Sequence, residues 1–291
     1  MYNKIEACPL CSNTTSEPYN RIKDFAVTKE SFSLVKCRSC SFIYTNPRPF
    51  NQNIDRYYES NNYISHSKKS GNIIDRIYYL TRYLMLRKKL NWIHEVLGLK
   101  GRLLDYGCGT GSFVSLALKK NWDIWGVEPN RLARSIANNN GNLRVFDSLN
   151  ALPENQFDAI TLWHVLEHLT DLEQIVNALI SRLTESGHLV IAVPNCACYD
   201  AQYYAEYWAG FDVPRHLSHF TPESMKLLIK KHRLHLIKLI PLKLDAFYIC
   251  MLSEKYRNGS IFKAFSQAVK SNFRAKRNRL NYSSLVYVLR K

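Results

Sequence analysis

The sequence lacks both a bilayer-spanning stretch and a secretory leader. Although 46% of the 291 residues are hydrophobic, no apolar run approaches the roughly 20 residues that a membrane-spanning helix needs. The first residues, Met1-Tyr2-Asn3-Lys4, do not begin a leader pattern. These absences predict a cytoplasmic chain without a membrane span. The apolar content is sufficient for one large domain, or for one large domain and a small module.

Acidic residues are also few. The chain has 24 Asp and Glu against 40 Lys and Arg, which gives a formal net charge of +16. No acid occurs in residues 255–291, where basic residues are frequent. This imbalance favours an anionic partner, such as nucleic acid, a phosphorylated or sugar-nucleotide substrate, or anionic lipid. A solvated basic face without a partner would explain the charge equally well.

Four of the eight cysteines form two C-x2-C pairs. The pairs are Cys8 with Cys11 and Cys37 with Cys40. In a chain without an export signal such pairs indicate metal binding rather than disulfides. Four thiolates can close a tetrahedron around zinc and leave no open position for chemistry, so the predicted zinc site is structural.

The cysteine pairs define a predicted zinc-ribbon-like module over residues 1–50. Alternating apolar residues over 19–35 predict a short hairpin between the two pairs. A ribbon that grips substrate or nucleic acid is the alternative to a purely structural module.

Glycine is scarce, with 11 in the chain, yet Gly107, Gly109 and Gly111 occupy alternate positions. They follow an apolar run that contains Asp105 and precede a helical pattern over 113–118. Strand, glycine turn and helix together form the first unit of a doubly wound α/β sheet. Because glycine has no side chain, a ligand can lie directly against this backbone. The spacing does not match the dinucleotide fingerprint G-x-G-x-x-G.

Further strands with acidic ends follow this turn. The second, 122–128, ends in Glu128, which could accept hydrogen bonds from both ribose hydroxyls of a nucleoside. The third, 142–147, ends in Asp147, and the fourth spans 157–163. Later strands are predicted at 187–195, 234–239 and 283–289, and a long helix at about 72–97.

The D-x-G-x-G-x-G pattern and these strands resemble the class I S-adenosylmethionine (AdoMet)-dependent methyltransferases from residue 101 to the end of the chain. The resemblance implies an α/β fold with a seven-stranded, doubly wound Rossmann-like sheet whose last strand is antiparallel. It implies AdoMet as cofactor, with the following contacts: Asp105, Gly107, Gly109, Gly111, Glu128, Asp147, Ser148, Leu149 and Trp163. A non-binding α/β domain with tight turns is the structural alternative.

The same resemblance implies a domain organisation. Residues 1–50 would form the zinc-ribbon-like module, 51–100 a helical lead-in or lid, and 101–291 the methyltransferase domain. That domain would contain a substrate insertion at about 196–222 and a basic segment at 255–281. Similar cysteine modules occur on some methyltransferases of sugar and natural-product pathways.

Three candidate catalytic residues follow the fourth strand. In a helical turn, His164, Glu167 and His168 would share one face. A histidine could then take a proton from a hydroxyl nucleophile while Glu167 orients it. The three side chains could instead bind a divalent metal, or form a structural pair.

The metal hypothesis rests on a resemblance. Ubiquinone-pathway O-methyltransferases and small-RNA 2′-O-methyltransferases carry an E-x-x-E-H metal motif at the matching place. Here His164 replaces the first glutamate of that motif, so the sequence departs from the metal-binding pattern.

The predicted insertion is dense in aromatic residues and histidines, which favours ligand binding by a loop. Trp208 and Phe211 are expected to wall a pocket and Arg215 to hold an anion. His216 or His219 is a further candidate base or a third metal ligand. Histidines that only hydrogen-bond the loop backbone are the alternative.

The predicted function is AdoMet-dependent methyl transfer to a small-molecule acceptor, with O-methylation favoured over C-methylation. The acceptor would be a sugar, a polysaccharide or lipid-linked precursor, or a secondary metabolite. It would be anionic if the basic surface contacts it. An RNA methyltransferase that uses the basic C-terminal face is one alternative. A non-catalytic AdoMet-binding scaffold is another. The sequence leaves the acceptor and the oligomeric state open.

Overall fold

The computed structural model describes residues 2–50, 53–58, 73–139, 143–153, 156–277 and 281–291. The chain divides into two compact units. Unit 1 consists of Met1–Tyr63, His164–Val176 and Ile191–Leu289. Unit 2 consists of Ile64–Trp163, Asn177–Val190 and Arg290–Lys291.

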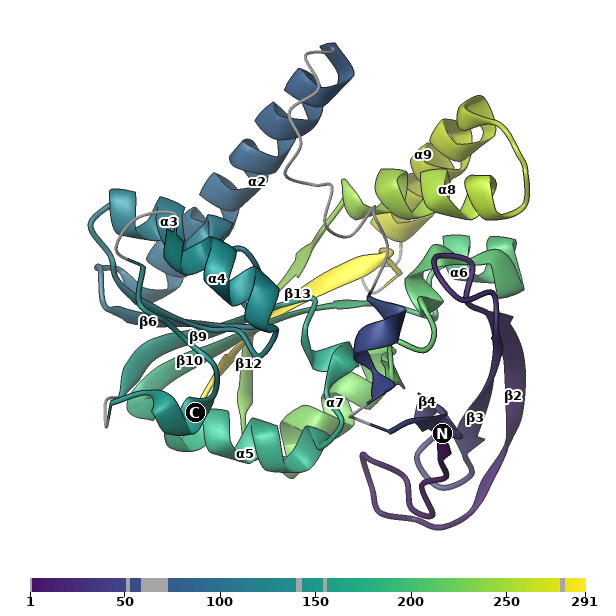
Figure 1. Ribbon diagram of the computed structural model, residues 1–291, viewed down its shortest axis with the longest axis horizontal. Helices are drawn as coiled ribbons and strands as arrows, with labels where there is room; N and C mark the ends of the chain where they lie inside the picture. The colour runs from purple at the N-terminus through teal and green to yellow at the C-terminus, as the bar shows by residue number, and fades with distance from the viewer. Residues whose placement is uncertain (1, 51–52, 59–72, 140–142, 154–155, 278–280) are drawn as a thin grey trace. The chain divides into compact units, whose positions relative to one another are not determined.

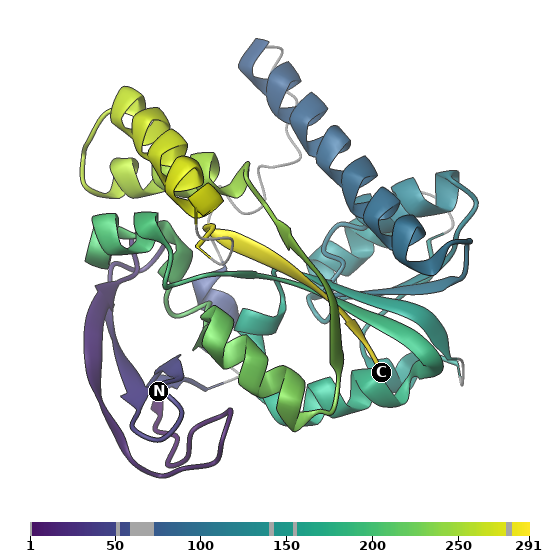
Figure 2. The same cartoon turned by 180° about the vertical axis from the view of Figure 1, so that it is seen from behind.

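Seven strands form one mixed sheet, in the order β12-β13-β10-β9-β6-β7-β8 (Figures 1 and 2). The last strand, β13 (Ser284–Arg290), is antiparallel to the others. Its neighbours are β12 (His235–Pro241) and β10 (Leu183–Pro194). The predicted doubly wound sheet with an antiparallel last strand is therefore confirmed.

Unit 2 contains four parallel strands of this sheet. Its strands are β6 (Arg102–Tyr106), β7 (Asp123–Val127), β8 (Val145–Phe146) and β9 (Phe157–Trp163). β6 pairs in parallel with β7 and β9, and β7 pairs in parallel with β8. The strands are almost continuously apolar and buried, as expected for a parallel sheet covered on both faces.

The helices of unit 2 precede or follow these strands along the chain. They are α2 (Ile73–Leu97), α3 (Ser112–Lys119), α4 (Arg131–Asn139) and the 3₁₀ turn η4 (Leu149–Ala151). The long helix expected at 72–97 is confirmed by α2. It ends at Gly98, whose φ of 72° is left-handed and whose N–H bonds the His94 carbonyl at 2.8 Å. Glycine adopts this helix-ending conformation without strain.

Unit 1 contains the N-terminal segment and much of the C-terminal half. A hairpin of β2 (Ser16–Lys23) and β3 (Ser31–Cys37) confirms the hairpin expected between the cysteine pairs. The hairpin belongs to a four-stranded sheet in the order β11-β4-β3-β2, with β4 at Ile43–Thr45 and β11 at Ser218–His219. Strand β11 comes from the predicted insertion, so the insertion and the cysteine module share one sheet.

The remaining elements of unit 1 are short strands, 3₁₀ turns and helices. They are β1 (Tyr2–Asn3), β5 (Arg48–Pro49), η2 (Asp55–Tyr57), η5 (Leu166–His168), α6 (Tyr199–Tyr204), η6 (Ala205–Tyr207), η7 (Ala209–Phe211), α7 (Pro222–Lys231), α8 (Asp245–Tyr256) and α9 (Ile261–Arg277). Helix α7 begins with a capping box at Thr221 and a proline at its first position. Helices α8 and α9 lie side by side in both views (Figures 1 and 2).

The division between the two units falls within helix α5 (Leu172–Ser181), after Val176. It ends two residues earlier than expected, and β10 starts at the buried Leu183 rather than at 187. The third strand is shorter than the expected 142–147. Within the part of the chain that the structure describes, no helix has the length and apolarity needed to cross a bilayer.

Candidate active site

The glycine turn adopts the backbone that its spacing predicts. Gly107, Gly109 and Gly111 have φ values of 73°, 55° and 74°, all in the left-handed region that glycine enters without strain. The Gly107 N–H donates to the Val127 carbonyl at 2.7 Å, which ties the turn to the end of β7. A Cβ atom at Gly126 would lie 2.7 Å from the Cys108 Sγ. Sequence reasoning did not single out Gly126, which allows the turn to approach β7 closely.

Glu128 lies beside this turn, directly after β7. Its Oε2 accepts the Gly109 N–H at 2.8 Å, and its Oε1 accepts the Asn130 N–H at 2.9 Å. A carboxylate offers about four lone-pair sites, so two hydroxyl donors can still bind. Burial raises the pKa of Glu128, while the two backbone N–H groups oppose that shift.

The space in front of the turn is open. A Cβ atom built at Gly109 would meet no atom of the described residues within 4 Å. The turn's central glycine is therefore not covered by side chains of the described part of the chain, and a ligand could approach its backbone.

The Asp105 side chain is too buried to contact a solvent-accessible ligand directly. It is 3% exposed, and its Oδ1 accepts the Thr161 hydroxyl at 2.7 Å. Burial raises the pKa of its carboxyl to about 7, against the opposing effects of Thr161 and Lys89. Asp105 thus lies on β6, and this hydrogen bond joins it to Thr161 of the neighbouring strand β9.

The other predicted cofactor residues also lie in unit 2. Asp147 and Ser148 are exposed beyond the end of β8, where the Ser148 hydroxyl donates to Asp147 at 2.9 Å. Leu149 begins η4 and is half-buried. Trp163 ends β9, and the Lys89 ammonium lies 4.4 Å from its ring centroid. Because β6 to β9 are parallel, their carboxyl ends lie on the same side of the sheet, and all nine predicted cofactor residues lie at or near these ends.

The candidate catalytic residues belong to unit 1, and the expected helical face does not form. His164 has a left-handed φ of 58°, and only Leu166–His168 form a short 3₁₀ turn. The His164 Nδ1 lies 3.4 Å from Glu167 and its Nε2 lies 3.1 Å from Asp245. Burial lowers the pKa of His164, but the two carboxylates outweigh it and raise the pKa to about 9.

A charged His164 is a poor metal ligand, because its ring nitrogens both carry protons. The metal set His164, Glu167 and His168 is therefore not the one that the structure assembles. Burial raises the pKa of Glu167, yet the neighbouring His164 outweighs burial and the pKa ends below its usual range. Glu167 and His164 consequently form an ion pair.

The structure instead groups Glu167, His168 and His216. Their potential ligand atoms all lie within 4.8 Å of one another, and the two imidazole rings meet edge to face with centroids 4.7 Å apart. The His168 Nδ1 lies 2.9 Å from the Arg215 carbonyl, and the His216 Nδ1 lies 2.9 Å from a backbone carbonyl of Gly210. A carbonyl only accepts, so each Nδ1 carries a proton.

The Glu167 carboxylate is the most unusual member of this group. It is 1% exposed, and neither oxygen has a hydrogen-bond partner among the described residues apart from the longer contact with His164. Burial and the neighbouring His216 lower the pKa of His168 to about 4, so this imidazole is neutral near pH 7. The His168 lone pair can accept a proton, and the two imidazoles with the Glu167 carboxylate are a donor set that a divalent metal could use.

Two expectations for the insertion do not hold. Arg215 is 2% exposed, and its guanidinium pairs with Asp24 at 2.9 Å and with Asp212 at 2.6 Å. It also donates to the Tyr57 carbonyl. Its donors are thus used within the protein, which contradicts the expectation that Arg215 holds a substrate anion.

The aromatic residues of the insertion are core residues. Trp208 and Phe211 belong to the buried hydrophobic cluster of unit 1 and meet edge to face at 5.1 Å. The Trp208 indole N–H donates to the buried Asp200 at 2.8 Å. The structure therefore places both rings in the core, where sequence reasoning expected the wall of a ligand pocket.

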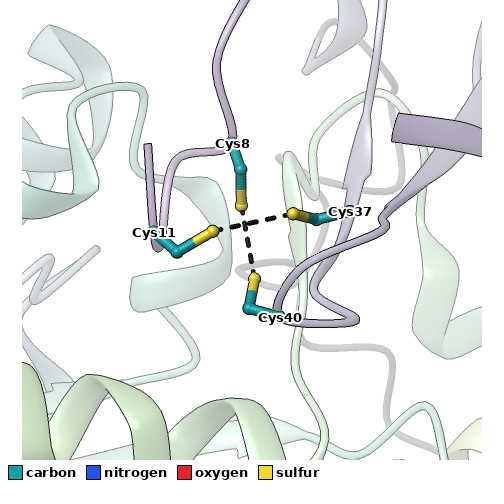
Figure 3. Close-up of side chains that lie close together, drawn as sticks. All are labelled: Cys8, Cys11, Cys37 and Cys40. Atoms are coloured by element: carbon teal, nitrogen blue, oxygen red, sulfur yellow. Dashed lines mark hydrogen bonds between the residues drawn. The ribbon is translucent and has the colours of Figure 1, made fainter. Parts of the chain in front are cut away.

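The four cysteines of the N-terminal pairs point toward a common centre (Figure 3). The Cys8 and Cys40 sulfurs are 3.6 Å apart, as are those of Cys11 and Cys37. A disulfide would need about 2.05 Å, whereas a zinc tetrahedron with Zn–S bonds of about 2.3 Å places its sulfurs about 3.8 Å apart. The four side chains fit a tetrahedral metal ion.

A family model described as a methyltransferase domain matches residues 78–239. The matched segment covers more than half of the chain and contains both the glycine turn and the histidine group. The chain belongs to this methyltransferase family. The expected membership in the class I superfamily is confirmed.

Curated relatives of this methyltransferase include two ubiquinone biosynthesis O-methyltransferases. The protein of Marinobacter nauticus is 28% identical over 119 residues, which cover 37% of this chain and 50% of the relative. The protein of Psychrobacter arcticus is 28% identical over 134 residues, with 37% and 52% covered. The chain spans about half the length of these relatives.

Among solved structures, the plantazolicin methyltransferase BpumL in complex with a pentazolic desmethylPZN analogue and SAH has a TM-score of 0.52. It is 16% identical, and the alignment covers 82% of this chain and 92% of that chain. At this identity the likeness concerns the fold.

Several residues that contact the histidine-rich segments were not found by sequence reasoning. Asp24 holds Arg215, although the two are 191 positions apart. The Thr45 hydroxyl donates to the His216 carbonyl at 2.9 Å and lies 3.1 Å from the His219 Nε2. Asp245 holds His164. These partners are distant in sequence, so no local pattern could have indicated them.

Proposed function

We propose that this protein transfers a methyl group from AdoMet to a small-molecule acceptor, on oxygen in preference to carbon. The observation that carries the proposal is the open glycine turn with the Glu128 carboxylate bonded to its central N–H. A bare backbone beside a carboxylate suits a nucleoside, whose ribose hydroxyls donate to the carboxylate.

The residues of unit 2 would hold the cofactor in defined ways. Glu128 would bind the ribose hydroxyls, and Asp147 with Ser148 and Leu149 would contact the adenine. The glycine turn would contact the rest of the nucleoside, and Trp163 would lie beside it. When bound, AdoMet supplies an activated methyl group on a sulfonium. The protein then has mainly to orient the acceptor and remove its proton.

Removal of that proton is assigned to the histidine pair of unit 1. The neutral His168 has a lone pair on Nε2, His216 lies beside it, and Glu167 would stabilise an imidazolium formed in this group. Replacing either histidine by Ala should lower kcat about 100-fold or more. Unchanged turnover in both variants would remove both as bases. A loss of activity with a chelator, restored by a divalent metal, would assign the group to metal binding instead.

Two considerations support oxygen as the acceptor atom. The curated relatives are named O-methyltransferases, and a hydroxyl acceptor needs the base that the histidine pair offers. The basic segment at 255–281 keeps an RNA acceptor as the alternative. RNA binding would weaken steeply with added salt.

We also propose that Cys8, Cys11, Cys37 and Cys40 hold a structural zinc ion. Burial raises the pKa of the Cys8 thiol to about 11, so this side chain would be protonated near pH 7 without a cation nearby. Zinc would deprotonate the thiols on binding and connect the two cysteine pairs.

The cofactor site is tested by titration calorimetry with AdoMet. Glu128→Ala should weaken AdoMet binding about 10- to 100-fold, because hydrogen bonds to a charged group contribute about 1.5–3 kcal/mol. The matched control is Asp123→Ala, which removes an exposed acid at the opposite end of the same strand and should leave affinity unchanged. Equal affinity in the wild type and Glu128→Ala would reject this site. Cofactor binding without transfer to any acceptor would favour a scaffold.

A further inference from the structure

Helix α9 has an unusual distribution of side chains. Its buried side is made of small residues, Ala264, Ala268, Ser271 and Ala275, together with Gln267. Its large apolar residues are exposed instead: Ile261, Phe262, Phe265, Val269 and Phe273. Phe262 is 83% exposed and Phe273 is 60% exposed. A helix that only packed on the core would bury these side chains.

The exposed apolar residues form one stripe. Positions 261, 265, 269 and 273 recur every four residues and therefore lie on one side of the helix, with Phe262 next to them. Only Phe265 contacts another aromatic ring within the described residues, since its centroid is 5.3 Å from that of the half-buried Phe247. Contiguous exposed apolar surface of this kind marks an interaction site.

Basic residues line the edge of this stripe. Lys263, Lys270, Arg274 and Arg277 lie beside it on the helical projection, and Lys276 lies within it. The helix contains no acidic residue. An apolar stripe with a basic border is the pattern of a helix that lies in the surface of an anionic membrane.

We propose that α9 docks this protein on a membrane surface that contains anionic lipid. Phe262 and Phe273 enter the boundary between headgroups and acyl chains, while the lysines and arginines contact lipid phosphates. The helix lies parallel to the surface and does not cross the bilayer. This inference is independent of the methyl acceptor and of the cofactor.

Other occupants fit the stripe less well. A second copy of the chain would bring two sets of basic residues together without any acid of α9 to neutralise them. RNA would suit the charges and could stack on the phenylalanines. It would gain little from Ile261 and Val269, which cannot stack on bases. Lipid uses the aliphatic, aromatic and basic residues together.

The test is flotation of the full chain with vesicles. Wild-type protein should float with vesicles of phosphatidylcholine and phosphatidylglycerol and much less with phosphatidylcholine alone. The double variant Phe262→Gln/Phe273→Gln should lose about tenfold or more in partitioning. Lys263→Gln/Lys270→Gln should lose about tenfold, and added salt should reduce wild-type binding.

Matched controls use exposed residues elsewhere in the chain. Leu99→Gln/Leu132→Gln removes two apolar side chains that are similarly exposed, and Lys226→Gln/Lys230→Gln removes two exposed charges of α7. Both should float like the wild type. Absence of flotation, or flotation that the α9 variants do not reduce, overturns the proposal. Two other outcomes would assign the stripe to a different partner and also overturn the proposal. In both, the protein does not bind vesicles, and the α9 variants alone abolish either its retention on single-stranded RNA or its dimer in sedimentation.

Discussion

Asp105 and Arg215 are both buried ionisable side chains, but only Arg215 has opposite charges in contact. Burial and Arg215 act against each other on Asp24 and Asp212: burial raises the pKa of each carboxyl, and the guanidinium holds it below the usual range. Among the described residues, the Thr161 hydroxyl is the hydrogen-bond partner of Asp105, and Lys89 acts on the carboxyl through its charge. The two residues should therefore affect stability in opposite ways.

The Asp105 carboxyl should make stability depend on pH. Its pKa is near 3.8 when unfolded and about 7 when folded. Between these values the unfolded chain has released the proton and the folded chain has kept it, so rising pH favours unfolding. The free energy of unfolding should therefore fall by up to roughly 4 kcal/mol between pH 4 and about pH 7.

Asp105→Asn should remove this loss, since the amide oxygen can still accept the Thr161 hydroxyl. Urea unfolding between pH 4 and 8, without cofactor, measures the difference. The variant should become more stable relative to the wild type as pH rises. Asp123→Asn, at the exposed start of β7, should keep the wild-type slope. Parallel pH curves for wild type and Asp105→Asn would contradict the assignment.

Arg215→Gln should strongly destabilise the protein. The change leaves Asp24 and Asp212 buried without their cation, which costs about 3–5 kcal/mol. Arg38→Gln is the matched control, because Arg38 pairs with Glu17 at 3.4 Å on the surface, where such a pair contributes below about 1 kcal/mol. Urea unfolding of both variants at pH 7 is the measurement. A similar decrease in the free energy of unfolding in the two variants would mean that the buried ion pairs of Arg215 do not stabilise the protein.

At the scale of elements, sequence reasoning succeeded where the signal is local. The strand, glycine turn and helix at 102–119 follow from an apolar run and three glycines. The face proposed for His164, Glu167 and His168 failed, because His164 adopts a left-handed backbone that a helical pattern cannot indicate. Its partner Asp245 lies on α8, far along the chain.

The cysteine module contributes to the histidine group through β4. Strand β4 pairs with β11, and Thr45 at its end binds the carbonyl of His216. Loss of the proposed zinc ion should therefore loosen both the module and the segment that carries His216. The predicted module therefore contacts the rest of unit 1 directly, through a hydrogen bond to a residue about 170 positions away.

Cys8→Ala/Cys11→Ala should abolish zinc binding and lower the temperature of unfolding. Elemental analysis should find one zinc per wild-type chain and none in the variant. Hydrogen exchange should become faster at residues 216–219. The control Cys250→Ala removes a buried thiol outside the module and should keep the zinc. A variant that retains zinc, or a wild type without it after metal supplementation, would reject the metal site.

At the scale of the whole molecule, the sequence placed boundaries near residues 50 and 100, whereas contacts group residues 1–63 with 164–176 and 191–289. Sequence patterns describe neighbours along the chain, and the hydrophobic core joins residues that are far apart. Ile22, Phe32 and Leu34 of the module belong to the same buried cluster as Trp208 and Phe211 of the insertion. The division at residue 50 remains a prediction about independent folding.

Deletion of residues 2–49 tests that division directly. The deletion removes Ile22, Phe32, Leu34 and Ile43 from the shared cluster, which at about 1.5–3 kcal/mol each amounts to roughly 6–12 kcal/mol. Typical net stabilities are about 5–15 kcal/mol, so unit 1 should lose its cooperative fold. Hydrogen exchange should lose protection in α6, α8 and β11 while the strands of unit 2 serve as the internal reference. If protection in those elements equals that of the full chain, the N-terminal module folds separately and its contacts with the insertion contribute little stability.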